Sequence, residues 1–224
     1  AAAARAEAAS MAAAVQATEL EAKRAGLHED SLLSAADHAG ALAELLRERG
    51  QLGEAEPLHR QALAALERTL GPDHPSTLAT LSNLAELLRD QRRLKEAEPL
   101  HWRALRGCER VWGQEHAYTL TCLSNLAMLL EELHEFSEAE SLYRRALLGR
   151  QKVLGAAHPD TLVTANGLAS VLQEQGKLAE AEPLLRRTLE ARQQVLGAEH
   201  EDAVASADEL AALLARRGLL AAAE

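Results

Sequence analysis

Four histidines recur along the chain at a constant interval of 42 residues, each of them three positions after a glycine. They are His74, His116, His158 and His200, which follow Gly71, Gly113, Gly155 and Gly197. Histidine is a frequent zinc ligand, so a metal site is the first chemistry to consider. Zinc holds its ligands at about 2 Å, whereas equivalent positions in stacked helical repeats are separated by roughly 10 Å or more. We therefore predict that these histidines bind no metal and instead cap helices or brace the junctions between repeats.

A second pair of histidines, His59 and His101, has the same spacing, but later copies place Tyr143 and Leu185 at that position. A position that accepts His, Tyr and Leu is a packing position. The chain also lacks a nucleophile elbow, a P-loop and a glycine-rich dinucleotide-binding motif. The sequence therefore predicts a protein that is not an enzyme and needs no cofactor.

The interval of 42 residues, kept over three steps, predicts an all-α array of helix-turn-helix repeats. In the repeat that begins at Gly71, leucines 78, 81, 84, 87 and 88 form one apolar stripe. The first helix of this repeat, helix A, is expected over about residues 75–90, and the second, helix B, over about residues 95–112. The predicted division of the chain is a helical cap at 1–28, repeats at 29–70, 71–112, 113–154 and 155–196, and a partial repeat at 197–224.

Small residues recur at fixed places in these helices and predict close helix crossings. One helix A position holds Ala43, Ala85, Ala127, Ala169 and Ala211, and one helix B position holds Ala55, Ala97, Ala139, Ala181 and Ala223. The turn between the helices has an equivalent position too, occupied by Gly50, Arg92, His134, Gly176 and Gly218. Glycine there suits a left-handed residue that ends helix A. Arg92 and His134 should each cost about 1 kcal/mol if they adopt the same conformation.

Composition limits the classes of partner. The formal net charge is −10, which argues against nucleic acid and anionic membranes as main partners and favours a basic one, although solubility alone is the other explanation. The sequence contains no run of about 18 apolar residues, so no membrane insertion is expected. Cys108 and Cys122 are the only cysteines, which favours a reducing, cytoplasmic location.

The pattern of small residues resembles the tetratricopeptide repeat (TPR). Ala85, Arg92, Ala97, His101 and Ala104 stand where that repeat usually has a small residue, glycine, alanine, an aromatic residue and alanine. The longer unit, with LG-x-x-HP-x-TL, NLA and EAEPL-x-x-RAL, is similar to the subtype found in kinesin light chains and nephrocystin-like proteins, and in arrays attached to some signalling NTPases. The resemblance implies a right-handed α-solenoid that binds other proteins.

The resemblance also implies that helix A lines an inner groove. The candidate partner-binding residues are Ser82, Asn83, Glu86, Arg89, Ser124, Asn125, Met128, Glu131, Asn166 and Gln173. In kinesin light chains the matching asparagines contact extended peptides, so Asn83 and Asn125 are expected to bond a peptide backbone. The alternative is that these two asparagines bond the neighbouring helix. Acids outnumber bases in the groove, which favours a peptide that carries Lys or Arg.

We therefore expect a protein-interaction scaffold that binds an extended or helical peptide, most simply a basic one, in its groove. Two alternatives remain at this stage: a structural subunit of a larger complex, and the sensor array of a larger signalling NTPase.

Overall fold

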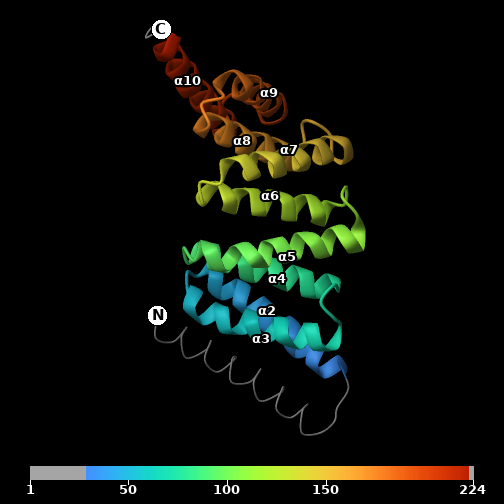
Figure 1. Cartoon of the computed structure of the whole chain (residues 1–224). Coiled ribbons are helices and arrows are strands. Elements are labelled where there is room, and N and C mark those ends of the chain that lie inside the picture. The colour runs from blue at the N-terminus through green and yellow to red at the C-terminus, as the bar shows by residue number, and fades with distance from the viewer. Residues whose placement is uncertain (1–28, 222–224) are drawn as a thin grey trace. The chain divides into compact units, whose positions relative to one another are not determined.

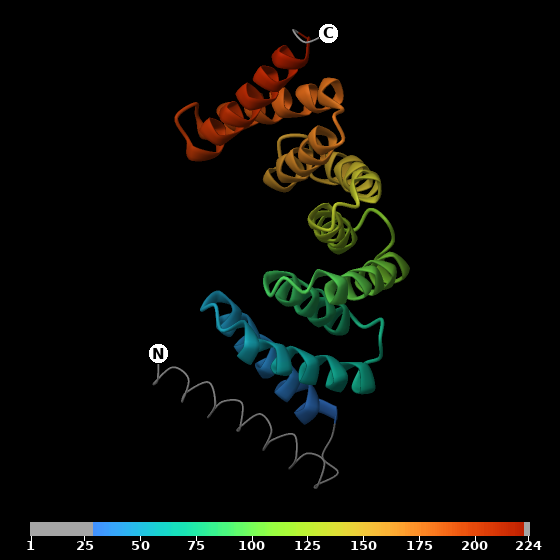
Figure 2. The same cartoon turned by 60° about the vertical axis from the view of Figure 1, so that its left-hand side comes forward.

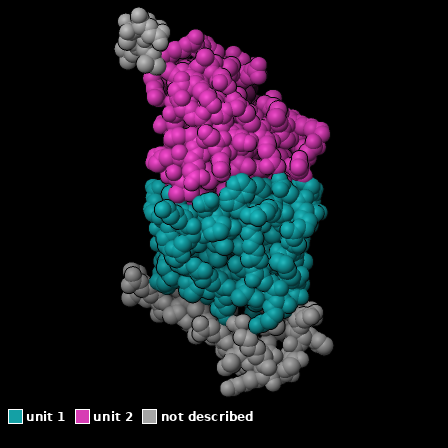
Figure 3. All heavy atoms as spheres, viewed as in Figure 1, with its two compact units in different colours: residues 1–113 teal, residues 114–224 magenta. Residues whose placement is uncertain are grey.

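The computed structural model describes residues 29–221, and among these residues it contains helices and turns but no strand. The chain forms two compact units, residues 1–113 (unit 1) and residues 114–224 (unit 2), which Figure 3 shows in different colours. The helical cap predicted at residues 1–28 lies outside the described residues.

Unit 1 contains the helices α2 (Glu29–Glu48), α3 (Leu52–Thr69), α4 (Pro75–Asp90) and α5 (Leu94–Trp112). Each of these helices packs on the next, and consecutive helices run in opposite directions (Figures 1 and 2). α2 also contacts α4, so two A-type helices lie beside each other. The predicted helices at 75–90 and 95–112 are confirmed, the second beginning one residue earlier than expected.

Unit 2 repeats this arrangement with α6 (Ala117–Glu132), α7 (Phe136–Val153), α8 (Pro159–Glu174), α9 (Leu178–Leu196) and α10 (Glu201–Ala221). Neighbouring helices again pack in sequence order, and α6 contacts α8 as α2 contacts α4. The predicted all-α repeat array is therefore confirmed in the part of the chain that the structure describes.

The recurring alanines lie in the core of both units. Ala43, Ala85, Ala127 and Ala169 on the A-type helices are fully buried, as are their counterparts Ala55, Ala97, Ala139 and Ala181 on the B-type helices. Leucines complete the core of unit 1, where Leu81 and Leu87 are both fully buried. Small side chains at fixed buried positions let helices approach closely, which is what the recurring alanines provide in four successive repeats.

The turn after helix A requires a left-handed residue, as predicted. Gly50 and Gly176 have φ angles of 74° and 76°, and Arg92 and His134 adopt the same conformation at 64° and 62°. The amide of the following residue bonds back into helix A, for example from Arg93 to the carbonyl of Leu88 at 2.9 Å. Two non-glycine residues thus take a conformation that is costly for an L-amino acid, because the packing of helix B fixes the turn.

The prediction of a turn at Gly218 is wrong. α10 runs through this position as one continuous helix to Ala221. The turns at Gly50 and Gly176 lead into helices whose Ala55 and Ala181 are buried, whereas the counterpart Ala223 lies outside the described residues. The predicted close crossing at Ala211 is also wrong, because this residue is exposed and the described residues supply no second helix on that side.

Polar bonds join successive B-type helices in each unit. In unit 1, Arg93 Nη1 lies 2.6 Å from Glu56 Oε2, and in unit 2 Lys177 Nζ lies 2.7 Å from Glu140 Oε2. The side-chain amide of Gln91 donates to the carbonyl of Leu52 at 3.0 Å, and Gln175 makes the equivalent bond in unit 2. Within each unit, these bonds tie one repeat to the next.

Candidate functional site

The four periodic histidines cap A-type helices, as predicted. Nδ1 of His74, His116 and His158 accepts a hydrogen bond from the backbone N–H two residues later, at 3.2–3.3 Å, and each residue is the N-cap of its helix. Nδ1 of His200 accepts from the amide of Asp202 at 3.2 Å, just before α10. These bonds satisfy amides that have no partner within the helix. Among the described residues, no group of three potential metal ligands comes together.

Several predicted groove residues meet in unit 1 as a network of ion pairs that joins α2 and α4. Arg47 donates from Nε to Glu44 and from Nη1 to Asp90, both at 3.0 Å. Arg89 Nη2 lies 3.1 Å from Glu86 Oε2. We call these five residues the α2–α4 charged cluster. Both of its arginines are bound to its own acids, so the cluster keeps an excess of negative charge.

Two buried histidines lie beneath this cluster. His59 is fully buried, and its Nε2 is 3.2 Å from Glu44 Oε1, although the two atoms are not aligned for a hydrogen bond. Burial lowers the pKa of His59, against the opposing effect of Glu44. His101 is buried too, and burial, aided by the charge of Arg89, lowers its pKa to about 4. Both imidazoles are therefore neutral at neutral pH. Burial also raises the pKa of the neighbouring Glu86 carboxyl, against the effect of Arg89.

Asn83 and Asn125 lie on α4 and α6, and both side chains are partly accessible. Neither side chain bonds to any residue that the structure describes, and neither has a buried polar atom without a partner. The alternative, in which these amides bond a neighbouring helix, therefore finds no support in residues 29–221. Each amide offers a donor and an acceptor to a bound backbone.

The remaining candidates of unit 1 flank these residues. Ser82 is partly buried and has polar interactions of its own. It precedes Asn83 on α4, one turn before Glu86, so the residues Ser82, Asn83, Glu86 and Arg89 follow one another along a single helix.

The candidates of unit 2 are more strongly engaged with the protein itself. Ser124 is buried and donates to the carbonyl of Leu120 at 3.1 Å, which places it in the core. Glu131 accepts from Tyr143 at 3.2 Å and from Ser170 at 2.6 Å. Asn166 donates to Glu209 at 3.0 Å. Met128 and Gln173 are partly buried.

Tyr143 occupies the space of the NLA-type asparagine on α8. The position equivalent to Asn125 is Gly167, and a Cβ atom there would collide with the Tyr143 ring. The aromatic ring therefore takes the space of a side chain. Sequence reasoning missed this contact, although two coupled departures from the repeat, Tyr143 for histidine and Gly167 for asparagine, could have indicated it.

No helix in the described part of the chain has the length and apolar character needed to span a membrane. Paired helices, caps at a constant interval and an accessible row of polar residues along the A-type helices define a helical-repeat protein. The chain belongs to the tetratricopeptide repeat family, which it matches over residues 33–110, 79–152, 118–193 and 160–224.

Solved structures of kinesin light chain-like repeat proteins are similar. A Podosopora anserina kinesin light chain with nearly identical TPR-like repeats is 28% identical, with a TM-score of 0.75 over 86% of this chain and 89% of that one. BtubC (BKLC) from P. vanneervenii is 24% identical, with a TM-score of 0.76 over 94% and 83%. The apo form of RapI shares the fold at 15% identity, with a TM-score of 0.67 over 94% and 79%. Comparison with curated protein sequences gives no match.

Proposed function

We propose that the chain is a non-catalytic scaffold that binds a peptide segment of another protein along its A-type helices. The observation that carries this proposal is the pair of side-chain amides at Asn83 and Asn125, which have no partner among the described residues and reach the surface. A polar group held on a helix without a protein partner bonds water instead, and a peptide backbone can replace that water with equivalent bonds.

The charge of the surrounding residues supports a partner segment that carries Lys or Arg. In unit 1, Glu44, Glu48, Glu86 and Asp90 stand against two arginines, and the cluster's bonds already occupy both arginines. In unit 2 the predicted surface adds Glu131, Glu132 and Glu174 without a base. Fixed charge of one sign raises association rates, whereas directed hydrogen bonds slow dissociation.

The engaged residues narrow the proposed surface. Ser124 is buried and the Asn166 amide already bonds Glu209. Neither side chain is therefore as available to a partner as the amides of Asn83 and Asn125. We therefore assign the backbone contacts to Asn83 and Asn125, and the charge steering to the α2–α4 charged cluster. The two buried thiols, Cys108 and Cys122, support a reducing, cytoplasmic environment.

The test is a selection of peptides from a random library, followed by affinity measurements on the double variant Asn83→Ala, Asn125→Ala. We expect the selected peptides to be enriched in Lys and Arg, and their affinity to fall with salt and to fall about tenfold or more in the double variant. Gln193→Ala, an exposed amide on α9 outside the proposed surface, is the matched control. Unchanged affinity in the double variant would show that peptides bind at another site, and it would favour a structural role in a larger assembly.

A further inference from the structure

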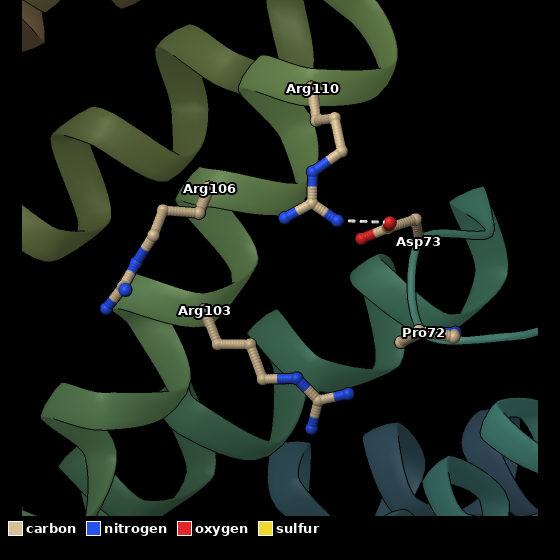
Figure 4. Close-up of a pocket in the computed structure, with 5 residues that line it drawn as sticks. All are labelled: Pro72, Asp73, Arg103, Arg106 and Arg110. Atoms are coloured by element: carbon tan, nitrogen blue, oxygen red, sulfur yellow. Dashed lines mark hydrogen bonds and ion pairs between the residues drawn. The ribbon is translucent and has the colours of Figure 1, made fainter.

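A basic hollow lies on the B-type helix α5 of unit 1, apart from the α2–α4 charged cluster. It has a volume of about 430 Å³ and is lined by Arg103, Arg106 and Arg110, with Pro72 and Asp73 from the loop before α4 (Figure 4). The arginines are spaced three and four residues apart, so their Cα atoms share one face of α5. Three guanidinium groups on one helix face stand out in a chain whose net charge is −10.

Two of the three arginines are held by carboxylates. Arg110 pairs with Asp73, as Figure 4 shows, and Arg103 Nη2 lies 2.5 Å from Glu67 Oε1. The first of these pairs recurs in the next repeat, where Lys152 and Glu115 form it at the equivalent positions, 42 residues later, at 2.6 Å. These pairs fix the position of two guanidinium groups, each of which has five N–H donors.

Arg106 has no such partner. Its Nε donates to the carbonyl of Trp102 on its own helix at 3.3 Å, and no described carboxylate pairs with it. Its side chain extends away from Asp73 in Figure 4 and is exposed, so rotation about its side-chain bonds can bring the guanidinium over the hollow. The equivalent residues in the other repeats are Ala64, Leu148 and Glu190. Packing of the repeat therefore does not require an arginine here.

We propose that this hollow binds a phosphorylated side chain of a partner protein. A phosphate group carries close to two negative charges and three acceptor oxygens, so it can accept from Arg106 and from further N–H groups of the two paired arginines. The net negative charge of the chain disfavours long polyanions such as nucleic acid or an anionic bilayer. The three arginines, set against Asp73 and Glu67, leave this site one net positive charge, and salt screens charges that lie more than about 10 Å away.

The chain supplies its own comparison for this site. The residues 84 positions after the hollow's lining are Ala156, Ala157, Arg187, Glu190 and Gln194, and these five are among the residues that line a hollow formed by α7, α8 and α9 in unit 2. Where the hollow on α5 has three arginines, the equivalent positions in unit 2 thus hold one arginine, one glutamate and one glutamine. This second hollow should not bind phosphate, which makes Arg187→Glu a control with the same change of net charge as Arg106→Glu.

The experiment uses the whole chain and three pools of fluorescent peptides with degenerate flanks around a central phosphoserine, serine or glutamate. We expect the phosphoserine pool to bind and the serine pool not to bind. Arg106→Glu should weaken phosphoserine binding about tenfold or more, while Arg187→Glu should change it less than twofold. Circular dichroism should show equal helix content in both variants, since the repeat already accepts Glu190.

Any of four results would overturn the proposal. One is equal binding of the phosphoserine and serine pools, and another is an equal loss of affinity in the two variants. The third is that phosphatidylserine vesicles bind through Arg106 while the phosphoserine pool does not, which would identify a lipid surface as the ligand. Displacement of the pool by inorganic phosphate at similar concentration would also count against it, because it would show that the peptide contributes nothing.

Discussion

Replacing the buried imidazole of His101 should make the free energy of unfolding of unit 1 depend less on pH. Burial lowers the pKa of this group from its ordinary value of 6.5 to about 4. Between these two values the unfolded chain binds the proton and the folded chain does not. The free energy of unfolding therefore falls as the pH is lowered from about 6.5 towards 4.

The magnitude follows from the size of this difference in pKa. One pKa unit corresponds to about 1.4 kcal/mol, so the full effect is about 3 kcal/mol below pH 4. At pH 5 the unfolded imidazole is almost fully protonated and the folded one is not, and the loss is about 2 kcal/mol relative to pH 7.5. This is large against a typical domain stability of about 5–15 kcal/mol.

The assay is urea unfolding of the whole chain at pH 7.5 and pH 5, with His101→Leu as the variant. Leucine is the native residue at the equivalent position, Leu185, where it is buried. Tryptophan fluorescence reports on unit 1, because Trp102 and Trp112 are the only tryptophans and both lie on α5. We expect the variant to lose about 2 kcal/mol less than the original chain between the two pH values.

Other groups near this site titrate as well, but they are common to both proteins. The lowered pKa of His59 adds to the acid sensitivity, and the raised pKa of Glu86 acts in the opposite direction. The comparison between the two proteins therefore isolates His101. If the loss of unfolding free energy between pH 7.5 and 5 is the same in both proteins, the imidazole is not held neutral by burial and the reasoning fails.

Three further predictions test the packing and the turns by urea unfolding at pH 7.5. Ala97→Leu should lower the free energy of unfolding by about 1–3 kcal/mol, because the crossing with α4 has no room for a larger side chain; an unchanged midpoint would contradict this. His116→Ala should cost about 1 kcal/mol through loss of the helix cap, and His116→Asn should restore most of it; equal stability of the two variants would refute the capping role. Arg92→Gly should stabilise the chain by about 1 kcal/mol, because glycine adopts the left-handed turn without strain; a loss of stability would show that the arginine side chain is needed there.

The order of helices and turns was predictable because it depends on local patterns that recur. The apolar stripe and the proline at residue 75 predicted α4 at its observed bounds, and the constant spacing of glycine and histidine predicted the caps. The left-handed conformation of Arg92 followed from its equivalence to Gly50. Each of these features is set within one repeat and repeated without change.

Features that depend on departures from the repeat were not predictable in the same way. Gly218 is the residue type that the turn favours, but a turn also needs a following helix to pack against. α10 continues through Gly218 instead. Ser124 has the spacing of a surface residue, yet it bonds the carbonyl of Leu120 within the core. Tyr143 and Glu131 are twelve residues apart and bond across a turn, and the other repeats carry different residue types at those two positions.

The neighbour-to-neighbour packing of the helices has a mechanical consequence. Within each unit, each described helix contacts the next in sequence, and further contacts lie between α2 and α4 in unit 1 and between α6 and α8 in unit 2. In the described part of each unit, helices thus contact mainly their neighbours in sequence, so a terminal repeat can detach while the other helices of its unit stay packed. Under tension applied at its two ends, the chain should therefore lengthen in steps rather than in one rupture. A repeat of 42 residues that unfolds supplies about 140–150 Å of extended chain. The array should therefore extend one repeat at a time when its two ends are pulled apart.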